Sequence, residues 1–405
     1  MLAGTNNFRK MHYDYRKNKR FTRIEINLSN LDHNLQLIKS RLKSPKVKIM
    51  AVVKSNAYGH GLIEISKQAV KSGVYALGVA FAAEGLALRK VGIEVPIYIL
   101  GEPPMEIVND AANNNFILCL NSFEKAKTIS QKCGNLGKKL KIHIKVNTGM
   151  NRLGINYRDA VEEIEKIISL PNLDVEGIFT HFSCAGEKDE SYTLMQWNKF
   201  ENVLGDLKRK SIIPPILHCA NSAAFLRYKD FHLDMVRLGI TIYGLSPFNG
   251  TGGKWLDPEI LSVLTKLKPV LSLKSKISFL KTLAAGESIS YGAAFKTNRH
   301  SVIATVPIGY ADGYTRLFSN KAKVLIGGQL APIVGNITMD HLMIDVTDIA
   351  LKRSLTAGEE VTFIGGNGDG DGKITADWLA GLIGTVNYEV LCMLKDQIPR
   401  VYVHT

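Results

Sequence analysis

The chain has 405 residues, of which 45% are hydrophobic and 22% charged, and these are ordinary values for a folded globular protein. The composition excludes intrinsic disorder, a collagen-like repeat and a small disulfide-stabilised scaffold. At about 100–200 residues per domain, the length predicts two or three domains. The formal net charge of +14 permits a nucleic-acid or membrane partner, so the positions of the charges matter.

Much of the positive charge lies in residues 1–23, which hold seven basic residues and one acid. We expect residues 1–22 to form a flexible basic extension rather than a secretory signal, because no apolar stretch follows the cluster. No apolar run approaches about 18 residues, so no transmembrane helix and no membrane partner are expected. Five scattered cysteines without a CxxC pair favour a reducing, cytoplasmic location over disulfides or structural zinc.

Eight short apolar runs, separated by segments of helical periodicity, follow one another from residue 47 onward. Continuous runs rich in Val, Ile and Phe are typical of buried parallel strands. Eight strand–helix units predict a TIM-like (β/α)8 barrel, with a doubly wound open sheet as the alternative. The runs are Val47–Val53, Ala76–Phe81, Ile97–Leu100, Phe116–Leu120, Leu140–Val146, Val175–Phe182, Ile216–Cys219 and Met235–Tyr243.

The rhythm changes after about residue 258, where short strand-like runs follow closely and glycine-rich turns separate them. Helical patterning is sparse until Ala376–Leu382. The pattern predicts an α/β barrel over residues 23–257 and a mainly β domain over residues 258–405. The strand-like runs are Val270–Ile277, Ser301–Pro307, Lys323–Ile326, Leu342–Val346 and Glu360–Ile364.

Catalytic residues of a barrel lie at the carboxyl ends of its strands, so the residues that follow each run are the candidates. Lys54 follows the first run, where burial should lower the pKa of its amine and suit it to Schiff-base chemistry. Arg152 lies in a glycine-containing turn after the fifth run and could bind a carboxylate or phosphate. The alternative is that Lys54 and Arg152 are solvated surface residues.

Further candidates follow the last three runs of the barrel. His181 is either a site residue or a satisfied core histidine, and Ser222 is either a phosphate ligand or a helix cap. Arg237 lies inside an apolar strand, where a guanidinium is costly without an acceptor. An amine nucleophile beside a phosphate cradle, with arginines on the same barrel face, indicates pyridoxal 5′-phosphate as the cofactor.

Several motifs occur in the order in which the bacterial alanine racemases have them, and the longest surrounds Lys54. From about Arg23 to its end, the chain resembles this family of two-domain pyridoxal-phosphate enzymes. The resemblance implies an isomerase that interconverts L-alanine and D-alanine and supplies D-alanine for peptidoglycan. The motifs are Ala51–Gly61, Asn147–Gly154, Thr180–Phe182, Val236–Tyr243, Ser290–Gly292, Gly309–Gly313 and Val386–Val390.

The resemblance implies two catalytic bases on opposite faces of the substrate, as the transfer of a proton from one face of Cα to the other requires. Lys54 is implied as the lysine that carries the cofactor and as the base for the D-enantiomer. Tyr291 is implied as the base for the L-enantiomer, contributed by the partner subunit. The protein is therefore expected to be a homodimer with shared active sites.

Other roles are also implied by the resemblance. Arg237, supported by His218, faces the ring nitrogen of the cofactor, and His181 packs on the ring. Arg152 and the backbone of Met339 take the substrate carboxylate. The phosphate is held by Tyr58, Ser222, Tyr388 and the backbone of Gly239 and Ile240. Tyr310 lines the entrance beside the substrate. Supporting positions are Lys145, which aligns with a lysine often found carbamylated, and Asp340 beside Met339.

The chain departs from the family pattern at Asn147, where an acid is common, and at Asn336, where a basic residue is common. The alternatives are a racemase of serine or of a basic amino acid, and a barrel-type decarboxylase, against which Arg237 argues. The charge also permits a nucleic-acid-binding protein, but the sequence contains no zinc-finger or basic-zipper pattern. The segment 367–374 resembles the start of an EF-hand loop, but Trp378 stands where the bidentate Glu should be, so no metal is expected.

Overall fold

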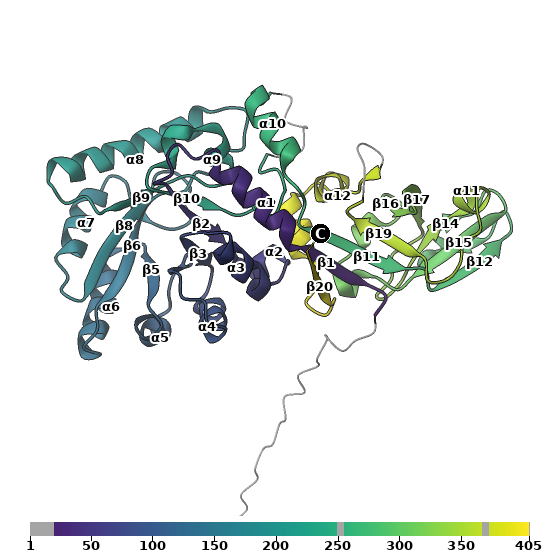
Figure 1. Ribbon diagram of the computed structural model, residues 1–405, viewed down its shortest axis with the longest axis horizontal. Coiled ribbons are helices and arrows are strands. Elements are labelled where there is room, and N and C mark those ends of the chain that lie inside the picture. The colour runs from purple at the N-terminus through teal and green to yellow at the C-terminus, as the bar shows by residue number, and fades with distance from the viewer. Residues whose placement is uncertain (1–19, 249–254, 367–371, 405) are drawn as a thin grey trace, which may run out of the picture. The chain divides into compact units, whose positions relative to one another are not determined.

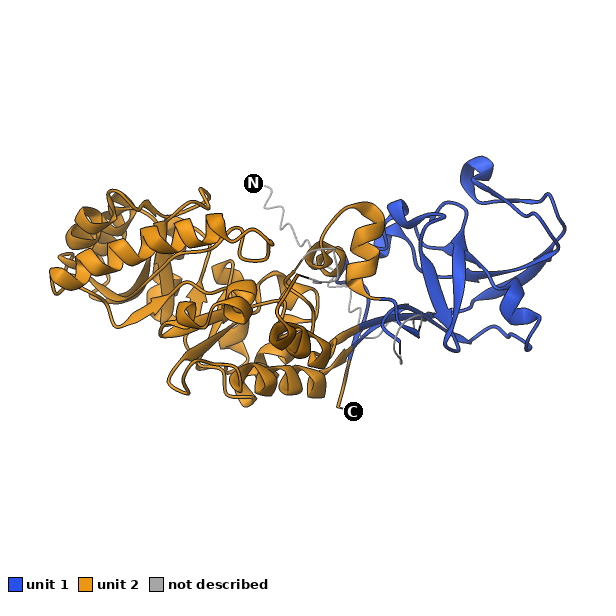
Figure 2. Ribbon diagram, turned by 90° about the horizontal axis from the view of Figure 1, so that it is seen from above, with its two compact units in different colours: residues 1–25, 272–374, 394–401 blue, residues 26–271, 375–393, 402–405 orange. Residues whose placement is uncertain are grey.

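The computed structural model describes residues 20–248, 255–366 and 372–404. The chain forms two compact units, which Figure 2 distinguishes by colour. The barrel unit comprises residues 26–271, 375–393 and 402–405, and the β unit comprises residues 1–25, 272–374 and 394–401. The helices after residue 375 therefore belong to the barrel unit, which the predicted division at residues 257/258 did not anticipate.

The barrel unit is built on parallel strands in the order β10-β2-β3-β4-β5-β6-β8-β9, with the short β7 paired to β6. Backbone hydrogen bonds between the two ends close the barrel: Asp234 N donates to Leu217 O, and Arg237 N donates to Ala220 O. The strands are β2 (Lys48–Val52), β3 (Ala76–Val79), β4 (Ile97–Ile99), β5 (Phe116–Leu120), β6 (Leu140–Asn147), β7 (Ile155–Asn156), β8 (Leu173–Phe179), β9 (Ile216–His218) and β10 (Met235–Leu238).

Helices surround these strands, as Figure 1 shows. Each carries an apolar stripe toward the strands, and in α7 the buried residues include Ile164 and Ile167. The helices are α1 (Leu28–Lys39), α3 (Leu62–Lys71), α4 (Ala82–Lys90), α5 (Val108–Asn113), α6 (Phe123–Asn135), α7 (Ala160–Ile168), α8 (Ser191–Arg209), α9 (Ser222–Arg227), α10 (Pro258–Lys266), α12 (Ala376–Ile383) and α13 (Asn387–Cys392).

The predicted barrel is confirmed, because each of the eight apolar runs overlaps one of the eight principal strands, with ends that differ by a few residues. Some predicted runs are longer than the strands, because buried residues continue past the end of the strand. An example is the run Met235–Tyr243. Buried side chains of Met50, Tyr98 and Met235 pack together in the barrel interior.

The β unit contains a nine-stranded sheet in the order β12-β15-β18-β17-β16-β19-β11-β1-β20. Adjacent strands such as β15 and β18 pair antiparallel, and the unit is mainly β, as the closely spaced runs predicted. Its strands are β1 (Arg23–Asn27), β11 (Leu271–Lys276), β12 (Phe279–Leu283), β15 (Ser301–Val306), β16 (Lys323–Ile326), β17 (Gln329–Val334), β18 (Leu342–Asp345), β19 (Glu360–Ile364) and β20 (Arg400–Val403), beside the hairpin β13 (Ser288–Ile289) and β14 (Phe295–Lys296) and the helix α11 (Thr347–Ala350).

Strand β1 corrects one expectation, because residues 23–27 pair within this sheet although the sequence placed them in the barrel domain. Their alternating burial is typical of an antiparallel strand with one face on a core. Most of the predicted basic extension, and most of the segment that resembles an EF-hand loop, lie outside the described residues.

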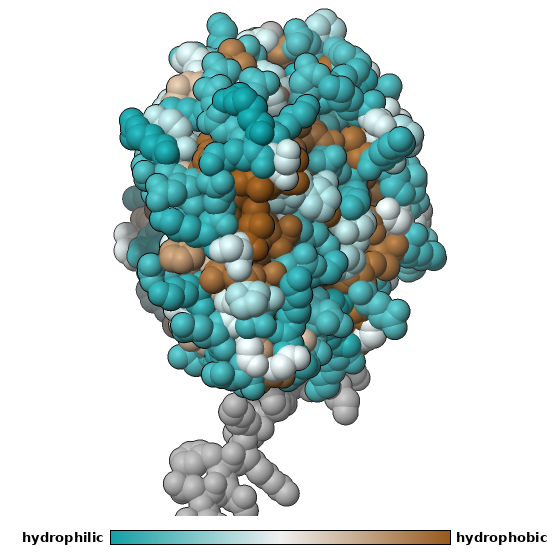
Figure 3. All heavy atoms as spheres, turned by 90° about the vertical axis from the view of Figure 1, so that its left-hand side faces the viewer, coloured by the Kyte–Doolittle hydropathy of each residue, from teal (hydrophilic) through white to brown (hydrophobic). Residues whose placement is uncertain are grey.

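The outer face of the barrel unit around α6, α7 and α8 is mostly hydrophilic, with a band of apolar side chains within it (Figure 3). In the described part of the chain, no helix is both long and apolar enough to cross a membrane.

Candidate active site

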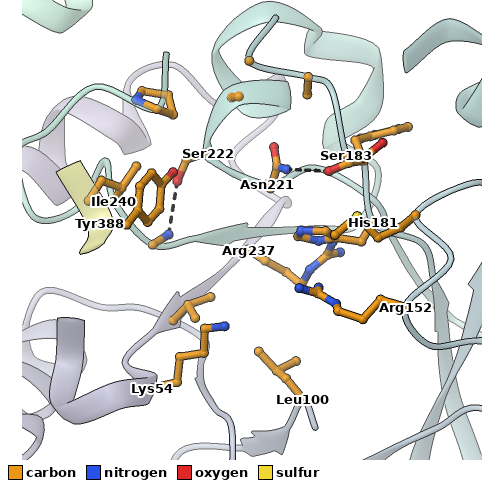
Figure 4. A pocket seen from close by; sticks show the side chains of 18 of the residues that line it. Lys54, Leu100, Arg152, His181, Ser183, Asn221, Ser222, Arg237, Ile240 and Tyr388 are labelled. Carbon is orange, nitrogen blue, oxygen red and sulfur yellow. Dashed lines mark hydrogen bonds between the residues drawn. The ribbon is translucent and has the colours of Figure 1, made fainter. Parts of the chain in front are cut away.

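A cavity of about 620 Å³ opens at the carboxyl ends of the barrel strands. This volume is within the range of small-molecule and cofactor sites. Figure 4 shows Lys54 between two groups of side chains, with Arg152 and His181 on one side and Ser222 and Tyr388 on the other. Ten of the predicted site residues line the cavity: Lys54, Tyr58, Lys145, Arg152, His181, Ser222, Arg237, Gly239, Ile240 and Tyr388.

Lys54 begins an unusual backbone segment. The segment labelled α2 (Lys54–Tyr58) is not a right-handed helix, because Ser55, Asn56, Ala57 and Tyr58 all have φ between 53° and 55°. Left-handed backbone costs a residue with a Cβ about 1–2 kcal/mol, so four consecutive cases require strong support from their surroundings. Such strain is concentrated at functional sites.

The support for this turn comes from polar groups on both sides of it. Glu84 on α4 accepts hydrogen bonds from Asn56 N (3.4 Å) and from Ala80 N (2.9 Å). The Asn56 side chain in turn accepts from Leu62 N at 2.7 Å, at the start of α3. The turn is therefore held between two helices, and it fixes the direction in which Lys54 leaves β2.

The cavity concentrates positive charge. Burial, followed by repulsion from Arg152, lowers the pKa of Lys54. The same two causes lower the pKa of Lys145 to about 8. Both amines therefore have a raised neutral fraction, and the site favours anionic ligands.

Arg237 is 5% exposed, yet no carboxylate pairs with it among the residues that the structure describes. Its Nη1 donates to His218 Nδ1 at 2.8 Å, and its Nη2 donates to Thr180 O at 2.8 Å and to His181 Nδ1 at 3.1 Å. Burial lowers the pKa of Arg237 to about 10, so the guanidinium stays charged at neutral pH. Because both histidines accept, they are neutral.

Residues 221–222 were expected to act as a helix cap or as a phosphate ligand. In the structure the two residues make different contacts. Asn221 caps α9 by accepting from Ala224 N at 3.0 Å. The Ser222 hydroxyl instead accepts from Gly239 N at 3.2 Å and contacts the Thr241 hydroxyl at 3.0 Å. A Cβ at Gly239 would lie 2.5 Å from the Tyr58 hydroxyl, so only glycine allows this close approach.

Four predicted residues do not line this cavity and belong to the β unit. Tyr291 is 74% exposed, Met339 53% and Tyr310 43%, and Asp340 is exposed as well. Backbone hydrogen bonds join the turns of Tyr310 and Met339, since Ala311 N donates to Met339 O at 3.0 Å. The departure Asn336 contacts the turn of Tyr291, because its Nδ2 donates to Tyr291 O at 2.8 Å.

Sequence reasoning missed a polar group behind Arg237, made by His143 on β6 and Glu176 on β8. His143 Nδ1 lies 2.8 Å from His218 Nε2, and His143 Nε2 lies 3.3 Å from Glu176 Oε2. A signal was present, since His143 and Lys145 are two residues apart in an apolar strand and so face the same side.

Comparison with known proteins gives matches over most of the chain. The family models described as "Alanine racemase, N-terminal domain" and "Alanine racemase, C-terminal domain" match residues 26–247 and 270–402. The alanine racemase of Halothermothrix orenii is 43% identical over 388 residues, which cover 95% of this chain and 98% of that protein. The alanine racemase of Methanococcus maripaludis is 43% identical over 94% of this chain and 98% of that protein.

Solved structures agree with these matches. The alanine racemase of Clostridium difficile 630 superimposes with a TM-score of 0.86 at 39% identity, covering 95% of this chain and 96% of that one. The Bacillus anthracis alanine racemase with bound L-Ala-P gives a TM-score of 0.86 at 37% identity, covering 95% and 96%. With this fold and these relatives, the chain belongs to the alanine racemase family and is an isomerase.

Proposed function

We propose that this protein interconverts L-alanine and D-alanine with pyridoxal 5′-phosphate as cofactor and supplies D-alanine for peptidoglycan in the cytoplasm. The observation that carries the proposal is the constellation around Lys54, in which a partly buried amine of lowered pKa shares a cavity with two arginines and a small-residue cradle. Family membership adds support, because the relatives named above are alanine racemases.

The residues present fit this cofactor. The Ser222 hydroxyl, the backbone of Gly239 and Ile240, and the Tyr58 and Tyr388 hydroxyls would hold its phosphate. Arg237 would donate to its ring nitrogen, and His181 would pack on the ring. Because Gly239 has no side chain, the Tyr58 hydroxyl can lie close to the backbone there, which groups several potential phosphate donors in one place. When bound, the cofactor supplies an electron sink that makes the α-proton of an amino acid removable.

The side chains would then hold and move the proton. Arg152 would bind the substrate carboxylate through its guanidinium, together with the backbone of Met339. Lys54 Nζ would take or return the α-proton on one face. Its lowered pKa raises the fraction that can accept a proton at neutral pH. Arg237 stays charged, so it would donate to the ring nitrogen rather than accept a proton from it.

The second base is proposed to be Tyr291 of the partner subunit in a homodimer. Tyr291 and Met339 are exposed in the β unit and are absent from the lining of the cavity. A second copy of the chain would bring both residues to the site, with Tyr310 and Asp340 beside them. Lys145 would orient Arg152, and its neutral amine is the form that reacts with carbon dioxide to give a carbamate and a proton.

The deciding experiment is an enantiomer interconversion assay of the purified protein with each common amino acid, followed by chiral chromatography. Alanine should be converted in both directions and faster than serine, lysine or arginine. A preference for serine, lysine or arginine would change the substrate assignment, and release of carbon dioxide would identify a decarboxylase. The protein should also have a visible absorption band from the bound cofactor, which Lys54→Ala should remove.

A further inference from the structure

A continuous hydrogen-bonded chain crosses the interior of the barrel from Arg237 to Glu176. It passes from Arg237 Nη1 to His218 Nδ1 (2.8 Å) and from His218 Nε2 to His143 Nδ1 (2.8 Å). It ends where His143 Nε2 contacts Glu176 Oε2 at 3.3 Å. His218 and His143 are completely buried, so water does not compete for these contacts.

The direction of every hydrogen bond in this chain is fixed by its two ends. Arg237 can only donate, so His218 Nδ1 accepts and the His218 proton lies on Nε2. That proton is donated to His143 Nδ1, which places the His143 proton on Nε2. An ionised Glu176 can only accept, and it accepts the hydrogen bond from His143 Nε2–H. Both histidines are thereby held as the neutral Nε2–H tautomer.

Glu176 is well placed to remain ionised. Lys141 Nζ donates to its Oε1 at 2.6 Å, and the Tyr98 hydroxyl donates to its Oε2 at 3.3 Å. The hydrogen bond from His143, with Lys141 beside it, lowers the pKa of Glu176 to about 2. Burial lowers the pKa of His143, so the pair is a neutral imidazole that donates to a carboxylate.

The packing leaves the two imidazoles little freedom to turn. The His218 ring stacks on Phe179 with centroids 4.8 Å apart, and the His143 ring meets Tyr98 edge-on at 4.8 Å. Gly177 leaves the space for His143, because a Cβ there would lie 2.3 Å from His143 Cε1. Packing thus fixes the orientation of the two rings, and the charged groups of Arg237 and Glu176 fix the positions of their protons.

We propose that Glu176 is a positioning residue for Arg237, acting through the tautomers of His143 and His218. The inference rests on the proposed function, in which Arg237 donates to the ring nitrogen of the cofactor. Without the carboxylate, the His143 proton has no acceptor and moves to Nδ1, where it opposes the His218 proton. His218 then loses its fixed tautomer, and Arg237 loses a directed acceptor.

The test uses two substitutions at one position in the purified holoenzyme. Glu176→Gln keeps an oxygen that can accept from His143, whereas Glu176→Leu keeps the bulk and removes the acceptor. Lys141→Met is the matched control, because it removes the exposed partner of Glu176 and leaves the carboxylate in place. Histidine tautomers are read by ¹⁵N NMR, with His143 and His218 assigned through single His→Asn variants, and kcat and KM for alanine are measured alongside.

We expect the Nε2–H tautomer at both histidines in the unsubstituted protein, in Glu176→Gln and in Lys141→Met. Glu176→Leu should lose the single tautomer at both rings, and its kcat should fall about tenfold with little change in KM, as loss of one buried charge-assisted hydrogen bond predicts. Retention of both tautomers in Glu176→Leu, or equal loss in Glu176→Gln, would overturn the proposal.

The NMR result also separates this inference from the proposed function. Failure of the unsubstituted protein to interconvert alanine enantiomers would contradict the proposed function. The histidine tautomers would still test whether Glu176 fixes them. An active enzyme with an Nδ1–H tautomer at His218 would contradict only the proposed role of Glu176.

Discussion

In the barrel unit several candidate residues, such as Lys145 and Arg237, are buried, whereas in the β unit Tyr291 and Met339 are exposed on the surface. Lys145 and Arg237 are 4% and 5% exposed, while Tyr291 and Met339 are 74% and 53% exposed. Burial lowers the pKa of Lys145 and of Arg237, and the Arg237 guanidinium is held by hydrogen bonds within one chain. The exposed side chains of Tyr291 and Met339 would need another molecule to desolvate them. If the proposed function holds, the difference teaches that one fold can complete half a site alone and leave the other half to assembly.

The largest expected effect tests the buried half. Lys54→Ala should reduce alanine racemisation by about 10⁴-fold, the upper range for loss of a positioned acid or base. The melting temperature should not fall, because the substitution removes a cation crowded by Arg152. Polarimetry and thermal unfolding are the measurements, with the exposed Lys71→Ala as control. Substantial remaining activity would contradict the assignment of Lys54.

The next prediction tests the exposed half. Tyr291→Phe should be nearly inactive yet as stable as the parent protein, because the ring is 74% exposed. Mixed with inactive Lys54→Ala, it should recover about a quarter of full activity, since random pairing makes half of the dimers mixed and each contains one intact site. Activity is followed after subunit exchange has been verified by mass spectrometry of differently tagged chains. Complete exchange without recovery would show that the site is not shared.

A third prediction concerns the cost of charge in the buried half. The pKa of Lys145 is about 8 in the folded protein, below its usual 10.5. Between these values the unfolded chain binds more protons, so the free energy of unfolding should rise with pH through this window. The rise should amount to about 3 kcal/mol and be absent in Lys145→Met.

Urea unfolding of the cofactor-free protein in buffers without carbon dioxide measures this dependence. Lys71→Met, a change at an exposed lysine, should keep the rise with pH. An identical slope in the parent protein and in Lys145→Met would contradict the prediction.

The smallest effect concerns the turn that carries Tyr310 in the β unit. Arg20 donates to Asp312 at 2.9 Å, and Asp312 is 1% exposed and also accepts from Gln397 at 2.8 Å. Arg20→Ala should lower the free energy of unfolding by about 2 kcal/mol, a typical value for a hydrogen bond to a charged group. Chemical denaturation measures the loss. Arg20→Lys should lose less stability than Arg20→Ala, because lysine keeps a positive charge beside Asp312. Unchanged stability would show that Gln397 and the Gly309 amide satisfy the carboxylate without Arg20.

The sequence predicted more of the barrel unit than of the β unit. In the barrel, buried strands and the site residues that follow them both produce a recognisable sequence pattern. Continuous apolar runs identified each principal barrel strand, and polar residues just beyond them identified the lining of the cavity, such as Lys54 and Ser222. Strand β1 was missed because five residues of alternating burial give a weak signal near a basic segment. Glu176 was missed because its partners come from β4 and β6, and such distant pairings leave no local pattern.

The left-handed turn at Ser55–Tyr58 also has a consequence for the order of folding. Unfavourable backbone angles are tolerated only after neighbouring groups such as Glu84 have arrived to hold them. The segment should therefore form after the transition state, and substitutions within it should alter the unfolding rate more than the refolding rate. In kinetic terms, we expect Lys54 to reach its final orientation among the last parts of the barrel, after the chain around it has folded.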